Sequence, residues 1–243
     1  MGVGPVSPLA SLRVRLFADG ADLATMLEMY RNPLIRGFTT NPTLMRRAGV
    51  KDYEAFAREV VQAIPDRPIS FEVFSDEFSD MRRQALRIAA WGEQVFVKIP
   101  VTNTAGASSA DLIRSLARSG VKLNVTALLT LHQVELVADA LAGGPPSYIS
   151  VFAGRIADTG IDPVPLMAEA VKAITPYPNL QLIWASPREV LNIFQADATG
   201  CHVITATADI LAKLALVGKN LSEFSLDTVK MFHADAAKAG YRL

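Results

Sequence analysis

The stretch Val95-Phe96-Val97-Lys98-Ile99-Pro100 consists of β-branched, aromatic and other apolar residues with a single lysine among them. Such a run predicts a strand that is buried on both faces, as in a parallel sheet covered by helices. A desolvated ammonium is costly or loses its proton, so an inward-facing lysine needs a chemical reason. Schiff-base formation is one, because a partly neutral lysine attacks a carbonyl. Alternatively, Lys98 lies at the strand end and reaches water or a carboxylate.

Strand and helix patterns alternate along the chain on both sides of this stretch. Strands are predicted at residues 13–19, 37–39, 69–73, 95–99, 122–126, 148–151, 181–185 and 202–205. Helices are predicted at residues 21–30, 53–64, 78–91, around 112–116, and at 131–141, 164–174, 187–198, 208–216 and 226–239. The segment 153–163 is predicted to be a loop.

This alternation decides between two architectures. Eight strand-helix units, spaced about 30 residues apart, predict a single-domain α/β protein with a closed (β/α)8 TIM barrel and an extra C-terminal helix. An open, doubly wound sheet is the alternative, but no Gly-x-Gly-x-x-Gly follows the first strand, where a dinucleotide-binding fold has its phosphate loop. No linker or charge block divides the chain. The barrel is therefore predicted to span residues 13–243, after a flexible leader at residues 1–12.

The composition narrows the compartment and the kind of partner. Of the 243 residues 50% are hydrophobic, yet no apolar run approaches the roughly 18 residues of a membrane span. The single cysteine, Cys201, excludes a disulfide framework and favours the cytoplasm. It is expected to be a small buried apolar residue, and the histidines lack metal-ligand spacing. Because 24 basic residues balance 24 acidic ones, we expect small-molecule partners and neither nucleic acid nor membrane.

Polar side chains stand at or near the carboxyl ends of the predicted strands, where a barrel of this kind builds its active site. In chain order they are Asp19; Thr39, Thr40 and Asn41; Glu72; Lys98; Asn124 and Thr126; Ser150 and Arg155; Ser186 and Arg188; and Thr205 and Thr207. Singly, several have ordinary explanations: Asn41 as a turn residue, and Ser186, Thr205 and Thr207 as helix caps. The caps remain our interpretation for Thr205 and Thr207. Together, a lysine nucleophile, carboxylates that move protons and neutral donors suit a polyhydroxylated substrate.

A series of motifs resembles the transaldolases, in order and over nearly the whole chain. They are Phe17-Ala18-Asp19, Gly37-Phe38-Thr39-Thr40-Asn41-Pro42, Phe71-Glu72-Val73, Val97-Lys98-Ile99-Pro100-Val101-Thr102, Asn124-Val125-Thr126, Ser150-Val151-Phe152-Ala153-Gly154-Arg155 and Ala185-Ser186-Pro187-Arg188. Each motif is short, but the combination is specific. Transaldolases are Schiff-base enzymes on a (β/α)8 barrel, which agrees with the fold expected from the periodicity.

The resemblance implies a role for each residue. Lys98 would form the Schiff base with a ketose phosphate, and Asp19 would be the acid/base at the C4 hydroxyl. Glu72 and Thr126 would hold the water that shuttles protons during imine formation. The substrate would be bound by Asn41, Asn124 and Ser150 at the dihydroxyacetone hydroxyls, and by Arg155, Ser186 and Arg188 at the phosphate. No metal or cofactor would be required, because the protonated imine is the electron sink, and barrels of this family form homo-oligomers.

Two positions bear on the type of reaction. In the pattern of the related fructose-6-phosphate aldolases, Gln stands in place of the glutamate of the third strand. Tyr stands in place of the phenylalanine that follows the sixth strand. Here the residues are Glu72 and Phe152, the latter also taken as a substrate-binding position, which favours transfer over free aldol cleavage. Pro187 and Gly20 depart from the family pattern, and they bear on acceptor choice and phosphate affinity.

The predicted function is therefore that of a transaldolase. It would move a dihydroxyacetone unit from fructose 6-phosphate or sedoheptulose 7-phosphate to an aldose phosphate, in carbohydrate metabolism of the pentose phosphate pathway type. The alternatives are an enzyme like the fructose-6-phosphate aldolases, a transaldolase of a specialised pathway, and a sugar-phosphate-binding protein without turnover.

Overall fold

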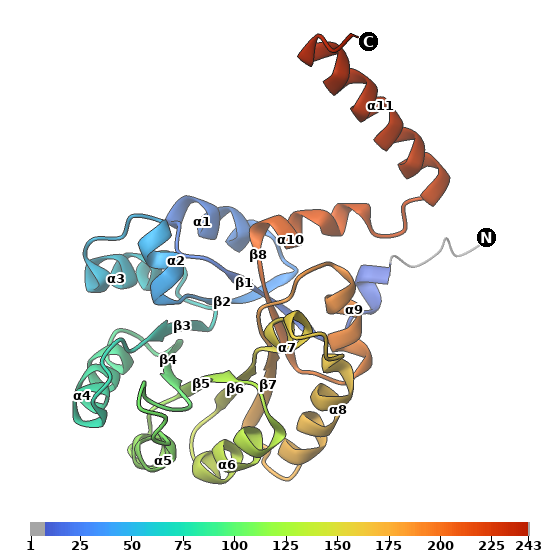
Figure 1. Cartoon of the computed structure of the whole chain (residues 1–243). Helices are drawn as coiled ribbons and strands as arrows, with labels where there is room; N and C mark the ends of the chain where they lie inside the picture. The colour runs from blue at the N-terminus through green and yellow to red at the C-terminus, as the bar shows by residue number, and fades with distance from the viewer. Residues whose placement is uncertain (1–7, 243) are drawn as a thin grey trace, which may run out of the picture. The chain divides into compact units, whose positions relative to one another are not determined.

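The central feature of the computed structural model is a closed barrel of parallel strands that pair in chain order, with β8 closing onto β1 (Figure 1). The structure describes residues 8–242. The strands are β1 (Arg15–Asp19), β2 (Ile35–Thr39), β3 (Ile69–Glu72), β4 (Val95–Pro100), β5 (Leu123–Leu128), β6 (Ser147–Val151), β7 (Leu180–Trp184) and β8 (Val203–Thr207). The predicted (β/α)8 TIM barrel is thereby confirmed.

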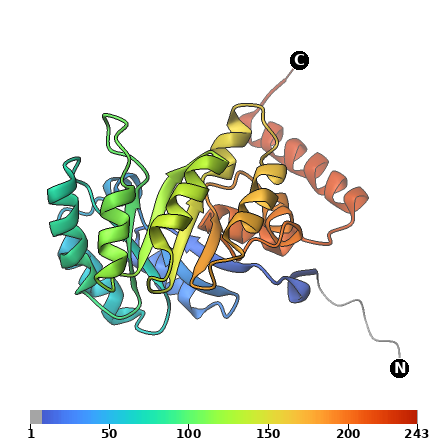
Figure 2. The same cartoon turned by 90° about the horizontal axis from the view of Figure 1, so that it is seen from below.

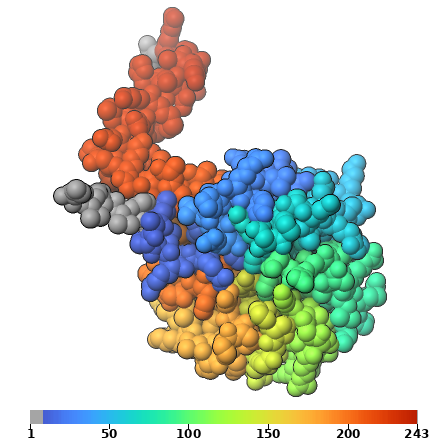
Figure 3. Space-filling view, turned by 180° about the vertical axis from the view of Figure 1, so that it is seen from behind, coloured from blue at the N-terminus to red at the C-terminus, as the bar shows by residue number. Residues whose placement is uncertain are grey.

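Helices between the strands of residues 12–212 cover the outside of the barrel, as Figure 2 shows for the green helices α5 and α6, which lie side by side. The helices are η1 (Pro8–Ser11), α1 (Leu23–Arg31), α2 (Pro42–Arg47), α3 (Tyr53–Ala63), α4 (Phe78–Ala89), α5 (Ala110–Arg118), α6 (Leu131–Leu141), α7 (Ala153–Asp158), α8 (Pro163–Ile174), α9 (Leu191–Ala198), α10 (Ala208–Ala212), η2 (Lys213–Leu216) and α11 (Leu221–Ala239). In Figure 3 the colours run in chain order around the barrel, as expected when successive units are neighbours.

Besides η1, which lies in the predicted leader, two short helices within the barrel were missed by the sequence pattern. The prediction of a loop at residues 153–163 is wrong, because α7 occupies its first part and α8 begins at Pro163. The other, α2, follows Asn41, for which a turn before proline was the ordinary alternative to substrate binding. Asn41 instead caps α2, since its side chain accepts a hydrogen bond from the Leu44 N–H at 2.9 Å. Both helices are only six residues long, too short for a clear periodicity.

The chain divides by its internal contacts into two units. One is the barrel, Leu12–Ala212, and the other comprises the segments before and after it. Residues 1–7 of the predicted leader lie outside the described residues, whereas Pro8–Ser11 forms the short helix η1. The extra C-terminal helix α11 has no buried residue. No helix in the described part of the chain is long and apolar enough to cross a membrane.

The side chains inside the barrel form layers, because every second residue of a strand points inward. Phe17, Phe96, Tyr148 and Val203 belong to one apolar cluster. Two residues further along the same strands stand, in the same order, Asp19, Lys98, Ser150 and Thr205. Alternate residues of a strand face the same side, so the polar side chains lie directly above an apolar floor. This floor keeps water from reaching the polar groups from below.

Candidate active site

The carboxyl ends of the strands surround a cavity of about 800 Å³. All residues predicted for the site line it, namely Asp19, Asn41, Glu72, Lys98, Asn124, Thr126, Ser150, Phe152, Arg155, Ser186 and Arg188. They come from successive strands or from the first residues after them, and parallel pairing in chain order places all these ends at one rim. The cavity is large enough for a sugar phosphate.

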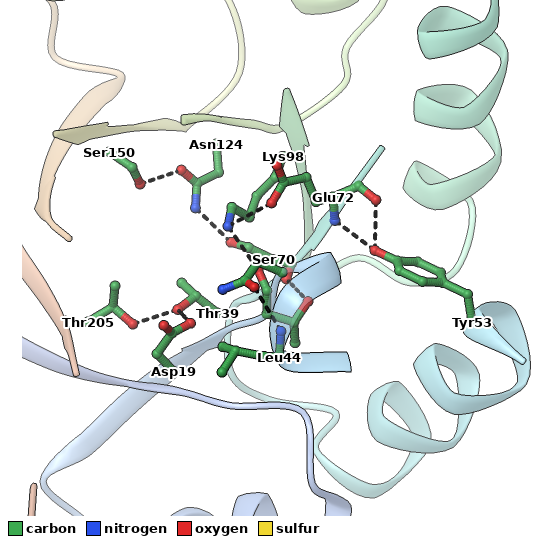
Figure 4. Close-up of polar contacts among 12 residues, drawn as sticks. Asp19, Thr39, Leu44, Tyr53, Ser70, Glu72, Lys98, Asn124, Ser150 and Thr205 are labelled. Carbon is green, nitrogen blue, oxygen red and sulfur yellow. Dashed lines mark hydrogen bonds and ion pairs between the residues drawn. The ribbon is translucent and has the colours of Figure 1, made fainter. Parts of the chain in front are cut away.

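Lys98 is the most deeply placed cation of the cavity, with an exposed fraction of 6%. Its Nζ donates a hydrogen bond to the carbonyl oxygen of Thr40 at 2.8 Å and lies 3.1 Å from Oε2 of Glu72 (Figure 4). The sequence left open whether Lys98 faces inward or reaches water or a carboxylate. It is buried in the middle of β4 and meets a carboxylate, which compensates the cost of desolvating its charge.

The path of β2 explains why a backbone carbonyl is free to accept from Lys98. Pairing between β2 and β3 ends at Thr39 and Ser70. The N–H and side-chain hydroxyl of Thr40 then both donate to the Ser70 carbonyl, at 3.1 and 2.8 Å. The chain turns away into α2 at Pro42, which has no N–H to continue a strand ladder. The Thr40 carbonyl therefore has no strand partner to compete with the lysine.

Asp19 lies at the end of β1, between the two strands that flank it in the barrel. Its Oδ1 accepts a hydrogen bond from the hydroxyl of Thr39 at 2.7 Å. Burial raises the pKa of the Asp19 carboxyl above its usual range, although the nearby Lys98 charge and the Thr39 hydrogen bond act to lower it. A carboxyl with a raised pKa exchanges protons more readily near neutral pH than an exposed aspartate does.

The interpretation of Thr205 as a helix cap is wrong. Its side chain is buried inside the barrel, and its hydroxyl lies 2.6 Å from that of Thr39. The predicted strand ended at residue 205, whereas β8 runs on to Thr207, so Thr205 lies within the strand and lines the cavity. Thr207 does lie at the strand end, where its hydroxyl contacts the Asp209 carboxylate.

A row of buried hydroxyl and amide groups faces Lys98 from the next strands. The Ser150 hydroxyl donates to Oδ1 of Asn124 at 2.7 Å, and Nδ2 of Asn124 donates to the Ser70 hydroxyl at 3.0 Å (Figure 4). This fixes the orientation of the Asn124 amide. The Thr126 hydroxyl is buried without a hydrogen-bond partner in the described chain. Because Thr126 also lines the cavity, this hydroxyl lies next to the space that a substrate would occupy.

The opposite part of the rim carries a cationic group of side chains. Arg188 makes a two-point ion pair with Asp158, with Nε 2.9 Å from Oδ1, and its guanidinium holds the pKa of Asp158 below the usual range. The guanidinium carbon of Arg155 lies 5.4 Å from the centre of the Phe152 ring. Asp158 was not predicted as a site residue, and it stands in the segment that was expected to be a loop.

The backbone at Ser186 has an unusual conformation, with a φ of 61° in the left-handed region. It is packed against Gly154, where a Cβ atom would lie 1.6 Å from the Ser186 carbonyl oxygen. A glycine is therefore required at residue 154 to let the first turn of α7 contact the backbone after β7. Non-glycine residues in this conformation concentrate at ligand sites, where the surrounding structure holds them in place.

Two further features lie outside this network. No group of three or more His, Cys, Asp or Glu side chains within residues 8–242 is arranged to hold a metal ion. Cys201 is buried, and burial raises the pKa of its thiol to about 12, so it is unsuited to act as a nucleophile.

Comparison with known proteins adds a family context to this geometry. A family model described as Transaldolase/Fructose-6-phosphate aldolase matches residues 16–243. A protein of Dehalococcoides mccartyi named "Probable transaldolase" is 31% identical over 218 residues, covering 88% of this chain and 97% of that protein. Another of that name, from Thermoanaerobacter sp., is 30% identical over 231 residues, covering 95% of this chain and 100% of that protein.

Solved structures show a similar fold at lower identity. Dihydrodipicolinate synthase from Rhodopseudomonas palustris superimposes with a TM-score of 0.58 at 15% identity, over 95% of this chain and 81% of that one. For 2,3-dimethylmalate lyase the TM-score is 0.55 at 12% identity, over 97% and 89%. At such identities the likeness extends to the barrel fold alone.

Proposed function

This chain belongs to the transaldolase/fructose-6-phosphate aldolase family, and we propose that it is a transaldolase that works through a Schiff base on Lys98. It transfers a dihydroxyacetone unit from a ketose phosphate, such as fructose 6-phosphate or sedoheptulose 7-phosphate, to an aldose phosphate. Such a reaction serves carbohydrate metabolism of the pentose phosphate pathway type. The observation that carries the proposal is the buried Lys98 ammonium, 3.1 Å from the Glu72 carboxylate at the floor of a polar cavity.

The first half of the reaction breaks a carbon-carbon bond. Lys98 Nζ adds to the C2 carbonyl of the ketose, and loss of water from the carbinolamine leaves a protonated imine. Glu72 takes up the surplus lysine proton and, with Thr126, holds the water that carries protons. Asp19 removes the proton of the C4 hydroxyl while the C3–C4 bond breaks. The electron pair of the C3–C4 bond moves into the imine and forms an enamine. The shortened aldose phosphate then leaves.

The second half reverses these steps with a new aldehyde. The enamine carbon attacks the acceptor carbonyl, Asp19 returns its proton to the new hydroxyl, and water hydrolyses the imine to free Lys98. Asn41, Asn124 and Ser150 hold the hydroxyls of the three-carbon unit throughout. Arg155, Ser186 and Arg188 bind the phosphate of donor and acceptor in turn, since guanidinium groups form charge-assisted hydrogen bonds with phosphate oxygens.

Trapping the intermediate tests the proposal directly. We expect incubation with fructose 6-phosphate, followed by borohydride reduction and peptide mapping, to place a dihydroxyacetone-sized adduct on Lys98. Lys98→Ala should yield no adduct. Lys122→Ala is a matched control, because this half-buried lysine donates to the Glu93 carbonyl and does not line the cavity, and it should keep the adduct. If ketose phosphates leave no adduct on the wild type, the Schiff-base proposal is wrong.

A second assay separates transfer from free aldol chemistry. Glu72 and Phe152 favour transfer, because the pattern of the related aldolases has Gln in place of this glutamate and Tyr in place of this phenylalanine. Dihydroxyacetone and glyceraldehyde 3-phosphate, supplied without a ketose donor, should give little fructose 6-phosphate with this protein. Rapid formation of the ketose phosphate would instead assign it as an aldolase. Binding without turnover of any donor and acceptor pair would support a sugar-phosphate-binding protein.

A further inference from the structure

The main-chain N–H and carbonyl of Glu72 form hydrogen bonds with a tyrosine side chain and not with a neighbouring strand. Tyr53 is the first residue of α3, and its hydroxyl donates to the Glu72 carbonyl oxygen at 2.7 Å. The same hydroxyl accepts a hydrogen bond from the Glu72 N–H at 2.8 Å (Figure 4). One oxygen atom thus satisfies both main-chain groups of a residue whose carboxylate contacts Lys98.

The need for this contact follows from the divergence of β2 and β3. The Ile69 N–H donates to the carbonyl of Gln94, just before β4, and the Val73 N–H donates to the carbonyl of Lys98 in β4. The main-chain groups of these two residues therefore point toward β4. Main-chain groups of successive strand residues point to alternate sides, so the N–H and carbonyl of Glu72 point toward β2. Because β2 has already turned away after Thr39, no strand remains to pair with Glu72. Buried main-chain groups without partners are costly, and the Tyr53 hydroxyl removes this cost.

The tyrosine is itself firmly placed. Its ring packs in edge or tilted contact with Phe71, Phe74 and Trp91, with centroid separations of 6.5, 5.5 and 6.0 Å. Burial raises the pKa of its hydroxyl well above the usual range, so it keeps the proton that it donates. An aromatic cluster outside the barrel therefore holds the ring of Tyr53 whose hydroxyl contacts the Glu72 backbone.

We infer that Tyr53 is a positioning residue for Glu72, an inference that rests on the proposed function. Its hydroxyl replaces the missing strand partner and fixes the end of β3, so that the Glu72 carboxylate remains within reach of Lys98 Nζ. Tyr53 is not among the residues that line the cavity, so it is placed to act through Glu72 and not on the substrate itself. Its effect on turnover passes entirely through the place of the carboxylate that moves protons as the imine forms and hydrolyses.

The variant Tyr53→Phe tests this, because it removes the hydroxyl and keeps the ring. We expect kcat to fall about tenfold with KM nearly unchanged, since a displaced acid/base group forfeits part of a contribution of roughly 10²- to 10⁴-fold. The matched control is Tyr148→Phe. That tyrosine is also buried and has a hydrogen bond to Arg15, but it belongs to the apolar floor. It should lose thermal stability and keep kcat.

Combining the variant with Glu72→Gln distinguishes positioning from general loosening of the fold. If Tyr53 acts through Glu72, then Tyr53→Phe lowers kcat by less than about twofold in the Glu72→Gln background. Losses that multiply, or a Tyr53→Phe enzyme with wild-type kcat, would overturn the inference and leave the Schiff base intact. Absence of a borohydride adduct on wild-type Lys98 would instead overturn the proposed function, and this inference with it.

Discussion

The hydroxyl oxygens of Thr39 and Thr205 lie 2.6 Å apart, on the two strands that flank β1 and its Asp19. Thr39 donates its proton to the Asp19 carboxylate, so it is Thr205 that donates to Thr39. The two threonines form a directed chain of hydrogen bonds that ends on the proposed acid/base. Hydrogen bonds in such a chain polarise one another, so Thr205 strengthens the contact to Asp19 without touching it.

Removing the first link should shift the pH dependence of the enzyme. Thr39→Val deletes a hydrogen bond that lowers the pKa of Asp19, a pKa that burial already raises. Asp19 must be a carboxylate to accept the C4 proton, and activity is therefore lost as the pH falls through this pKa. We expect the acidic limb of kcat/KM to move to higher pH in Thr39→Val. Thr39→Ser keeps the hydroxyl and should keep the wild-type profile; an unmoved limb in the valine variant would contradict the role of this contact.

Arg188 should discriminate between phosphorylated and plain sugars. Arg188→Ala is expected to raise KM for fructose 6-phosphate about tenfold or more, because a hydrogen bond to a charged group contributes about 1.5–3 kcal/mol. The same variant should leave any turnover of unphosphorylated fructose almost unchanged. Steady-state kinetics on both sugars checks this, with Arg46→Ala as control, since Arg46 lies outside the cavity lining. An equal loss on both sugars would place Arg188 outside the phosphate site.

The contact between Gly154 and Ser186 predicts a large effect from one methyl group. Gly154→Ala puts a Cβ atom 1.6 Å from the Ser186 carbonyl oxygen, so the start of α7 and the backbone at Ser186 must separate. We expect it to destabilise the fold by about 1–3 kcal/mol, as overpacking does, and to raise KM for phosphorylated substrates. Gly20→Ala is the control, because nothing lies within 4 Å of the added Cβ there. Urea unfolding of both variants measures the difference, and equal midpoints would be inconsistent with the contact.

Cys201 offers a test of burial that is independent of catalysis. Because burial raises the pKa of its thiol to about 12, almost none of it is thiolate at mildly alkaline pH. Ellman's reagent should find no reactive thiol in the folded protein and one per chain in denaturant. Rapid reaction of the native protein would show that β7 and β8 open more readily than their packing implies.

Much of the fold and of the cavity lining was predictable because both depend on local patterns. Apolar runs and amphipathic spacing identify the strand-helix units, and parallel pairing then gathers the strand ends. Asp19, Glu72 and Lys98 meet for this reason, although 79 positions separate Asp19 from Lys98. The exact strand limits are less well encoded. A shift of two residues at the end of β8 was enough to turn the buried Thr205 into an apparent helix cap.

The contacts that escaped prediction lack any local signal. Tyr53 opens an amphipathic helix, and its apolar ring accounts for its place in the pattern. Its hydroxyl matters only because β2 leaves the sheet early, which depends on the relative paths of two strands. Asp158 likewise acquires its partner Arg188 from 30 residues away, through the closure of the barrel. Such residues become visible only when three-dimensional neighbours are known.

The number of hydrogens on Lys98 Nζ limits how many of its two contacts can persist during turnover. The resting ammonium carries three N–H donors and contacts two protein acceptors, the Thr40 carbonyl and the Glu72 carboxylate. An imine nitrogen, in its protonated form, retains a single hydrogen. Each turnover of the proposed reaction must therefore release at least one acceptor that is satisfied at rest. In the proposed reaction, hydrolysis of the imine returns the lost contact to Lys98, so the step that frees the sugar also completes the hydrogen bonding of the resting site.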